Sequence, residues 1–415
     1  MTEPPGPVLA VDAAEVLARC DVLAGLSADR ASIRRAYLSP EHAAANAATR
    51  AWMEAAGMRA WQDEAGNIVG RYEGVKEGAP ALLLGSHLDT VPNAGRYDGP
   101  LGVMLAIAVV SRLAARGERL PFAVEVIGFG DEEGTRFGTT LLGSRAVAGT
   151  WDKRWWELRD ADGVSLVDAF LEFGLDPSRI LDAARDPGSV VGYLEAHIEQ
   201  GPYLEEAGRA LGLVSAIAGA RRFELTITGK AGHAGGVPFN RRRDALVGAA
   251  AAVLVIERVA KALDCVATVG MMSVRPGAAN VIPGEAVFSL DVRAATDERR
   301  DECWRTIQEE VQAFCQERRL VFSINETHSA PAQVPSDRLR AAVAAGIATT
   351  GDAEPLELLS RAGHDAMAIA SLTDWAMLFI ACEGGVSHHP DEDVNLPDVE
   401  KALDAFEAAV RAVGP

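Results

Sequence analysis

Hydrophobic positions in the first third of the chain follow two patterns. Some segments have helical spacing, and others are short continuous apolar runs. Helical spacing occurs in residues 9–26, 41–57 and 99–113, and strand-like apolar runs occur in 66–72, 81–85 and 122–129. Strands that alternate with helices of this length are typical of an α/β domain. We therefore predict a mixed, mainly parallel sheet covered by helices.

The pattern changes near residue 218 and changes back near residue 331. The segment between them predicts, in order, a strand at 222–228, a helix at 244–261, strands at 266–274 and 286–292, a helix at 297–318 and a strand at 320–325. This β-α-β-β-α-β order is that of a ferredoxin-like α+β domain. After it, 337–349, 375–382 and 398–413 resume the first pattern. We predict one domain made of residues 1–216 and 331–415, with a second domain, 217–330, inserted into it.

Composition excludes two classes of partner. The chain has 415 residues with 40 Lys+Arg and 59 Asp+Glu, so its formal net charge is 40 − 59 = −19. A nucleic acid or an anionic membrane surface requires a basic face, and this balance argues against both. The longest apolar stretches run about ten residues, whereas a membrane span needs about 20.

The termini and cysteines point to a cytoplasmic protein. The first residues, MTEPPGPVLAVDAAEV, lack the basic and apolar regions of a signal peptide. The cysteine count is five, an odd number, and the spacings contain no CxxC. We expect neither a disulfide framework nor thiolate metal ligands.

Candidate chemistry begins where the predicted strand at 81–85 ends. His87 and Asp89 follow it, and Asp98 lies in a glycine-flanked loop before the next helix. Ligands of α/β proteins gather at the carboxyl ends of parallel strands. Asp89 is placed to orient the His87 imidazole, as carboxylates do for metal-bound histidines. Taken alone, His-x-Asp is more often a hydrogen-bonded pair in a loop.

A second strand end carries three consecutive acids, Asp131, Glu132 and Glu133. Adjacent carboxylates repel one another unless they are solvated or bind a cation. One member of such a pair can bind a metal while its neighbour handles the proton of a water molecule. A solvated acidic turn is the simpler interpretation of this motif alone.

Three further segments add histidines. His197 lies in YLEAHIEQGPYLE, His233 in GKAGHAGGVPFN and His388 in GGVSHHPDED. Each alone is explained by a core histidine or a flexible loop. Together with the acids they form a mixed imidazole and carboxylate set that suits Zn²⁺, Mn²⁺, Co²⁺ or Ni²⁺ better than Mg²⁺ or Ca²⁺.

These five segments, in this order, resemble the hydantoinase/carbamoylase family of dinuclear metal amidohydrolases, relatives of metallo-aminoacylases and carboxypeptidases. The resemblance covers essentially the whole chain and implies two divalent metal ions per subunit. Asp98 would bridge the two metals, His87 and His197 would complete one, Glu133 and His388 would complete the other, and Glu132 would be the general base.

The resemblance also implies roles for the inserted domain and for the substrate contacts. The domain would be a lid and dimerisation domain of a homodimer, with His233 polarising the substrate carbonyl from the partner subunit. Asn280 and Arg293 would hold the substrate carboxylate, and Gln200 would contact the ureido group. Gly363 and His364, in AGHDAM, would belong to a substrate-contacting loop. Arg361 precedes this loop where the family more often has glycine.

Within the family, NAGRYDG and TLLGSRAVAG are most similar to allantoate amidohydrolases. The implied reaction is hydrolysis of the terminal ureido C–N bond of a small ureido acid, with release of ammonia and CO₂. N-carbamoyl-L-amino acid hydrolase or β-ureidopropionase activity is the close alternative. A metallo-exopeptidase or aminoacylase and a catalytically inactive scaffold also remain, although the EAHIEQG string argues against the first and the intact Glu132 against the second.

Overall fold

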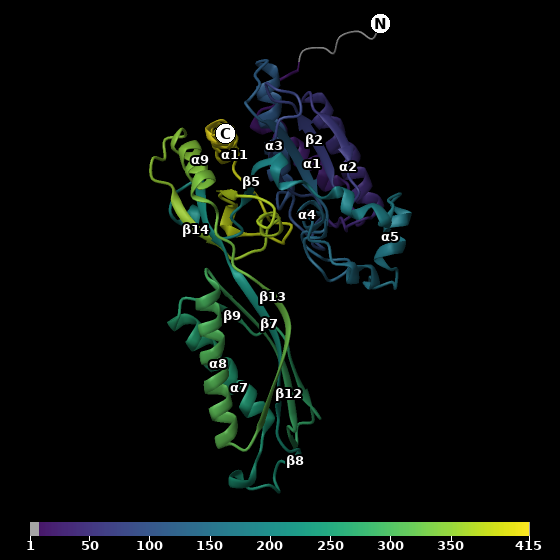
Figure 1. The fold of residues 1–415 in the computed structure, drawn as a ribbon. Helices are drawn as coiled ribbons and strands as arrows, with labels where there is room; N and C mark the ends of the chain where they lie inside the picture. The colour runs from purple at the N-terminus through teal and green to yellow at the C-terminus, as the bar shows by residue number, and fades with distance from the viewer. Residues whose placement is uncertain (1–7, 415) are drawn as a thin grey trace. The chain divides into compact units, whose positions relative to one another are not determined.

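The protein, described here by a computed structural model of residues 8–414, forms two compact units (Figure 1). The first holds the described residues through Ser215 and those from Pro335 onward, and the second is Ala216–Val334. Each unit has its own hydrophobic core. The domain boundaries expected from the sequence, 217 and 330, lie within four residues of these bounds.

The first unit is built on an eight-stranded mixed sheet with the order β1-β2-β4-β3-β5-β15-β6-β14. Its strands are β1 (Arg59–Gln62), β2 (Ile68–Tyr72), β3 (Ala81–His87), β4 (Ala123–Phe129), β5 (Val190–Ile198), β6 (Leu211–Ile217), β14 (Leu356–Ser360) and β15 (Trp375–Ile380). The four central strands, β4, β3, β5 and β15, run parallel. The predicted mixed, mainly parallel α/β fold is confirmed.

Helices flank this sheet. They are α1 (Ala13–Gly25), α2 (Pro40–Ala55), α3 (Pro100–Ala115), α4 (Leu142–Val147), α5 (Leu166–Glu172), α6 (Tyr203–Glu206), α9 (Asp337–Ala348), α10 (Ala366–Ile369) and α11 (Leu396–Ala412). Short 3₁₀ turns occur at Lys153–Glu157, Pro177–Ala183, Pro187–Ser189 and Glu383–Gly385. Ordinary capping starts the first two helices: the Asp12 side chain accepts from the Glu15 amide and the Ser39 side chain accepts from the His42 amide.

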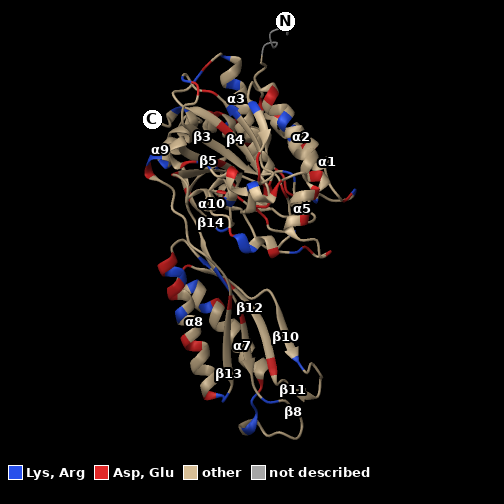
Figure 2. Cartoon of the chain, turned by 45° about the vertical axis from the view of Figure 1, so that its right-hand side comes forward, with Lys and Arg blue, Asp and Glu red and all other residues tan. Residues whose placement is uncertain are grey.

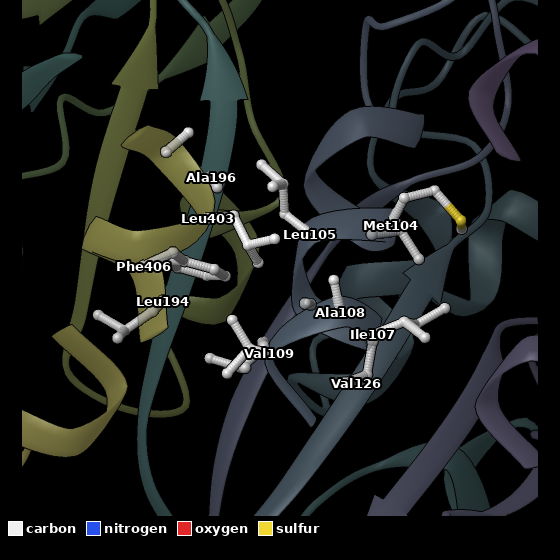
Figure 3. Close-up of a cluster of buried hydrophobic side chains, with 14 of the residues drawn as sticks. Met104, Leu105, Ile107, Ala108, Val109, Val126, Leu194, Ala196, Leu403 and Phe406 are labelled. Atoms are coloured by element: carbon white, nitrogen blue, oxygen red, sulfur yellow. The ribbon is translucent and has the colours of Figure 1, made fainter. Parts of the chain in front are cut away.

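The apolar helix α3 lies at the centre of the core. Its residues are buried along almost the whole length. Figure 3 shows its side chains in one cluster with side chains of β4, β5 and α11. Leu194 and Ala196 contribute from β5, and Leu403 and Phe406 contribute from α11. The loop that carries Asp98 leads directly into α3, so this packing also fixes the position at which the loop ends.

The longer elements of the second unit follow the predicted β-α-β-β-α-β order, and the short strands β8 (Gly232–His233), β9 (Val266–Thr268) and β11 (Val281–Ile282) are additional to it. The other elements of this unit are β7 (Gly219–Thr228), α7 (Ala245–Ala262), β10 (Met272–Arg275), β12 (Glu285–Ala294), α8 (Asp297–Glu317) and β13 (Val321–Ala330). A short 3₁₀ turn occurs at Phe239–Arg241. The main sheet is antiparallel with the order β10-β12-β7-β13, and the helices α7 and α8 pack on it. Figure 2 shows charged residues along α8 and few on the strands beside it.

Several strands differ from the expected elements. The strand expected at 266–274 is two strands, β9 and β10, which pair with different parts of β12. The strands β1, β5, β6 and β14 were not expected, and β5 carries the polar residues Glu195 and His197 inside a buried strand. A periodicity argument does not find a strand whose buried positions are polar.

The cysteines all lie within the described residues and all carry free thiols. Among residues 8–414, no helix combines the length and the apolar character that crossing a membrane requires.

Gly102 of α3 offers a test of how closely this helix must approach β5. A Cβ atom at this position would lie 2.1 Å from the backbone oxygen of Ala196. We expect Gly102→Ala to lower the melting temperature, because overpacking of this kind costs about 1–3 kcal/mol. Gly25→Ala, at a position with nothing within 4 Å of the added atom, is the matched control. Equal melting temperatures of the two variants would contradict the close contact.

Candidate metal centre

The parallel strands bring the predicted ligands to one edge of the sheet. In the register of β3 and β4, His87 lies opposite Phe129, so the acids 131–133 follow at the same level. His197 is the second-last residue of β5, next to Phe379 of β15. The chain that leaves β15 then reaches His388. Four neighbouring strands therefore direct their carboxyl ends toward a single site.

Asp98 lies at the centre of this site. Its Oδ1 atom is 3.7 Å from Nε2 of His87 and 3.3 Å from Nε2 of His197. Its Oδ2 atom is 3.1 Å from Nε2 of His388, and that nitrogen is 3.5 Å from Oε1 of Glu133. Two groups of three ligands result, His87–Asp98–His197 and Asp98–Glu133–His388, and they share Asp98.

The hydrogen bonds of the imidazoles fit a cation. Nδ1 of His87 lies 2.9 Å from the backbone oxygen of Asp89, and Nδ1 of His197 lies 2.9 Å from that of Ile198. With Nδ1 donating, the Nε2 atoms turn their lone pairs toward a carboxylate. Nε2 of His197 is buried and has no hydrogen-bond partner, because its approach to Asp98 lacks the required alignment. A positive charge between these atoms would satisfy both sides.

The close approach of the loop that carries Asp98 depends on Gly99. This residue has a φ of 87°, and a Cβ atom there would lie 2.6 Å from the His87 ring. Any side chain would therefore strain the backbone and displace the imidazole.

Glu132 is the buried carboxylate beside these ligands. Burial raises the pKa of Glu132 well above its usual value; His87 opposes this effect and the carboxylates of Glu133 and Asp365 add to it. Burial also raises the pKa of Glu133, to about 7. Gly363 lies next to Glu132, since a Cβ atom on this glycine would be 3.2 Å from Oε1 of the acid. The arrangement can exchange a proton with a molecule held at the cluster.

Asp89 orients His87 through its backbone oxygen, whereas the sequence predicted that its carboxylate would do so. Its backbone oxygen, and not its carboxylate, receives the His87 hydrogen bond, and the carboxylate lies 3.8 Å from Nδ1. The carboxylate instead accepts from the backbone amides of Glu132 and Glu133, at 3.0 and 3.2 Å. Asp89 thus fixes the acidic turn after β4 as well as the imidazole after β3.

Gln200 and His364, which were expected to contact substrate, touch the ligands themselves in this structure. Nε2 of Gln200 donates to both oxygens of Asp98, at 3.0 and 2.9 Å. The buried His364 ring packs edge-on against His197, with 4.5 Å between the ring centroids. Its Nε2 lies 2.7 Å from the hydroxyl oxygen of Ser360. The guanidinium of Arg361 lies over the Tyr203 ring, at 4.7 Å.

His233, Asn280 and Arg293 belong to the second unit. His233 pairs with Val281, and the amide of Ala234 donates to the backbone oxygen of Asn280, so the first two residues are neighbours. Arg293 is the ninth of the ten residues of β12 and forms an ion pair with Asp291 at 2.9 Å.

Asn280 and Arg293 lie at opposite ends of β12. Asn280 precedes β11, which pairs with β8 beyond the start of β12 (Figure 2). The eight steps from Glu285 to Arg293 span about 27 Å at 3.4 Å per residue. In one chain the two side chains therefore cannot hold the same small carboxylate. The expected pair requires one residue from each of two subunits.

Sequence reasoning missed three polar residues that support the ligands: Glu195, Ser387 and Glu392. Glu195 accepts from Ser86, Tyr193 and the amide of Ala366 and lies two residues before His197 on the same strand. Ser387 and Glu392 flank His388 in the segment already singled out for its histidines. Their position inside known motifs was the only signal that could have found them.

Comparison with known proteins identifies the family. The model of peptidase family M20/M25/M40 matches residues 83–412. The chain belongs to this family. Its members depend on metal ions, and the ligand groups around Asp98 fit that dependence.

Relatives of this M20-family chain include enzymes named allantoate deiminase and N-carbamoyl-L-amino acid amidohydrolase. It is 39% identical to allantoate deiminase 1 of Glycine max, over 93% of this chain and 86% of that protein. It is also 39% identical to the N-carbamoyl-L-amino acid amidohydrolase of Geobacillus stearothermophilus, over 87% and 88%. A crystal structure of a hydantoinase/carbamoylase family amidase from Burkholderia multivorans has a TM-score of 0.89 at 29% identity, covering 99% of this chain and all of that one. The expected family resemblance and fold are confirmed.

Metal addition tests the ligand groups. We expect Zn²⁺ to raise the melting temperature of the metal-free protein, because a ligand at 100 times its Kd stabilises the folded state by about 2.7 kcal/mol. Asp98→Asn should lose most of this response, since Asp98 is in both groups. Thermal unfolding with Zn²⁺ and with a chelator measures it.

The matched control is Asp63→Asn. Asp63 is also a buried carboxylate, but it bonds to Ala65 and Asn67 and belongs to neither ligand group. This variant should respond to Zn²⁺ as the unaltered protein does. A full Zn²⁺ response of Asp98→Asn would remove Asp98 from the metal centre.

Proposed function

We propose that this protein is a metal-dependent amidohydrolase that hydrolyses the terminal ureido group of a small ureido acid, most favourably allantoate. The observation that carries the proposal is the convergence of three imidazole Nε2 atoms on Asp98, beside the buried Glu132. The named activities of the relatives supply the substrate class.

The two ligand groups support two divalent cations that share Asp98. His87 and His197 would complete one site, and Glu133 and His388 would complete the other. Mn²⁺ or Zn²⁺ are the first choices, and Co²⁺ or Ni²⁺ also suit these ligands. When bound, such cations lower the pKa of water and polarise a carbonyl oxygen.

Glu132 is the proposed proton carrier. It takes a proton from the attacking water molecule and delivers it to the leaving nitrogen. Burial, which raises its pKa, favours the protonated carboxyl that this second step requires. The overall reaction is R–NH–CO–NH₂ + H₂O → R–NH₂ + CO₂ + NH₃, which balances in atoms and charge.

Substrate binding is proposed to use residues of two subunits. Arg293 offers the planar fork that grips a carboxylate. Asn280 lies beyond the first residue of β12, which is itself about 27 Å from Arg293 along the strand. Asn280 is next to His233, so these two residues would reach a site together. We infer a homodimer in which His233 of the partner subunit polarises the substrate carbonyl. Gln200, Gly363 and His364 would complete the substrate contacts.

The cellular setting is part of the proposal. Free thiols at all five cysteines fit a reducing compartment, and we place the enzyme in the cytoplasm.

N-carbamoyl-L-amino acids are the alternative substrates, supported by the equal identity to an enzyme that acts on them. The deciding assay measures ammonia release by the Mn²⁺- or Zn²⁺-loaded protein from allantoate, N-carbamoyl-L-amino acids and dipeptides. Fastest release from allantoate supports the first proposal. Hydrolysis of dipeptides alone would contradict both.

Glu132→Gln tests the proton carrier. The substitution keeps the side-chain size but removes the proton-accepting oxygen, so kcat should fall by about 10²–10⁴-fold. Zn²⁺ content, measured by atomic emission, should stay at the level of the unaltered protein. Near-normal turnover in this variant would require a different base.

A mixture of Glu132→Gln and His233→Ala subunits tests the contribution from a partner. Each homodimer should be inactive, but a mixed dimer contains one site with Glu132 and with His233 of the partner subunit. After random subunit exchange, about a quarter of normal activity should return, because half of the dimers are mixed and each has one complete site. No recovery, with exchange verified by mass spectrometry, would place His233 in the same subunit or outside the site.

A further inference from the structure

Glu392 is a buried carboxylate that the proposed reaction does not use. It lies between the 3₁₀ turn at Glu383–Gly385 and α11, and it is 2% exposed. Its Oε1 atom accepts from the backbone amides of Tyr97 and Asp98, at 2.8 and 3.1 Å. Its Oε2 atom accepts from the hydroxyl of Ser387 at 2.9 Å. One side chain therefore joins the segment that carries Asp98 to the segment that carries His388.

The Asp98 loop lies directly on this side chain. A Cβ atom on Gly95 would come within 2.1 Å of the Glu392 carboxyl carbon and 2.4 Å of its Cβ. The absence of a side chain at Gly95 allows this contact, and the contact fixes the height of the loop over the strand ends.

The Ser387 hydroxyl lies between two carboxylates. Its oxygen is 2.9 Å from Oε2 of Glu392 and 3.0 Å from Oδ2 of Asp98. A hydroxyl has one proton and donates it to one of these acceptors at a time. Oδ2 of Asp98, the oxygen nearest to Nε2 of His388, also accepts from Nε2 of Gln200 at 2.9 Å. When Ser387 donates to Glu392, this oxygen has one donor fewer and keeps a lone pair.

We propose that Glu392 is a positioning residue of the metal centre: it anchors the Asp98 loop and draws the Ser387 proton away from Asp98, which leaves a lone pair of Oδ2 for the cation on the Glu133–His388 side. This inference rests on the proposed two-cation site. It concerns the occupancy of one of the two positions and not the identity of the substrate.

Glu392→Gln reverses the direction of the Ser387 hydrogen bond while it keeps the size of the side chain. The two backbone amides hold the oxygen of the new amide, so its NH₂ group faces Ser387. The Ser387 hydroxyl must then accept a hydrogen bond from the substituted side chain at position 392 and donate its own proton to Asp98. There the proton competes with a cation for the carboxylate oxygen. We expect one Zn²⁺ to bind with unchanged affinity and the other to bind about 10–100-fold more weakly.

Two further variants separate positioning from general damage. Asp63→Asn is the matched control, because one oxygen of the buried Asp63 also accepts two backbone amides, those of Ala65 and Asn67. It should bind both cations normally. Ser387→Ala removes the competing proton, so Glu392→Gln added to it should weaken the second cation by less than about threefold.

The experiment is a Zn²⁺ titration of the metal-free variants in competition with a chromogenic chelator, with folding checked by circular dichroism. Selective weakening of one cation in Glu392→Gln, relieved in the double variant, supports the proposal. Two Zn²⁺ ions bound normally by Glu392→Gln, or equal weakening with and without Ser387, would overturn it.

Two other outcomes are also decisive. If the unaltered protein binds fewer than two Zn²⁺ ions, the proposed two-cation site fails and this inference fails with it. If Glu392→Gln does not fold, Ser387→Ala alone decides: the proposal requires its second Zn²⁺ to bind at least as tightly as in the unaltered protein, and a tenfold weakening would overturn it.

Discussion

The main physical constraint on this structure is the electrostatic cost of burying several carboxylates next to one another. Asp89, Asp98 and Glu132 are all buried at the ends of β3 and β4, and so is Asp131, whose two carboxylate oxygens have no hydrogen-bond partner. Like charges at such distances oppose ionisation, and burial raises the pKa of Asp131 well above its usual value. A cation held by the ligand groups around Asp98 would neutralise part of this charge.

The clustering of these carboxylates follows from the parallel strands of the sheet. Neighbouring parallel strands end at one edge, so the residues that follow them are gathered whatever their separation in sequence. The core beneath is almost purely apolar, with α3 covered by the sheet and by α11 (Figure 3). The packing is also close, since neither Gly99 nor Gly102 has room for a Cβ atom.

Sequence reasoning was strongest where a residue's chemistry and its local context agree. Apolar runs that end in His87 or in three acids indicate both a buried strand and a ligand. Periodicity alone also predicts the longer elements of the second unit, although not its short strands. Sequence reasoning was weakest where contacts join distant segments. Glu392 bonds to amides 294 and 295 residues away, and no local pattern encodes such a pairing. Which atom of Asp89 serves His87, and the separation of Asn280 from Arg293, likewise depend on backbone paths that only the folded chain defines.

The insertion of the second unit has a consequence for how this architecture can be rearranged. Ile217 and Gln333 exchange backbone hydrogen bonds, at 2.8 and 3.0 Å, where the chain enters and leaves that unit. The two crossings thus form an antiparallel bridge that a simple hairpin turn could close. Segments whose ends meet in this way can be removed, exchanged or lengthened with little disturbance to the host sheet. The β strands that carry the metal ligands are therefore topologically independent of the 119 residues of Ala216–Val334, counted as 334 − 216 + 1.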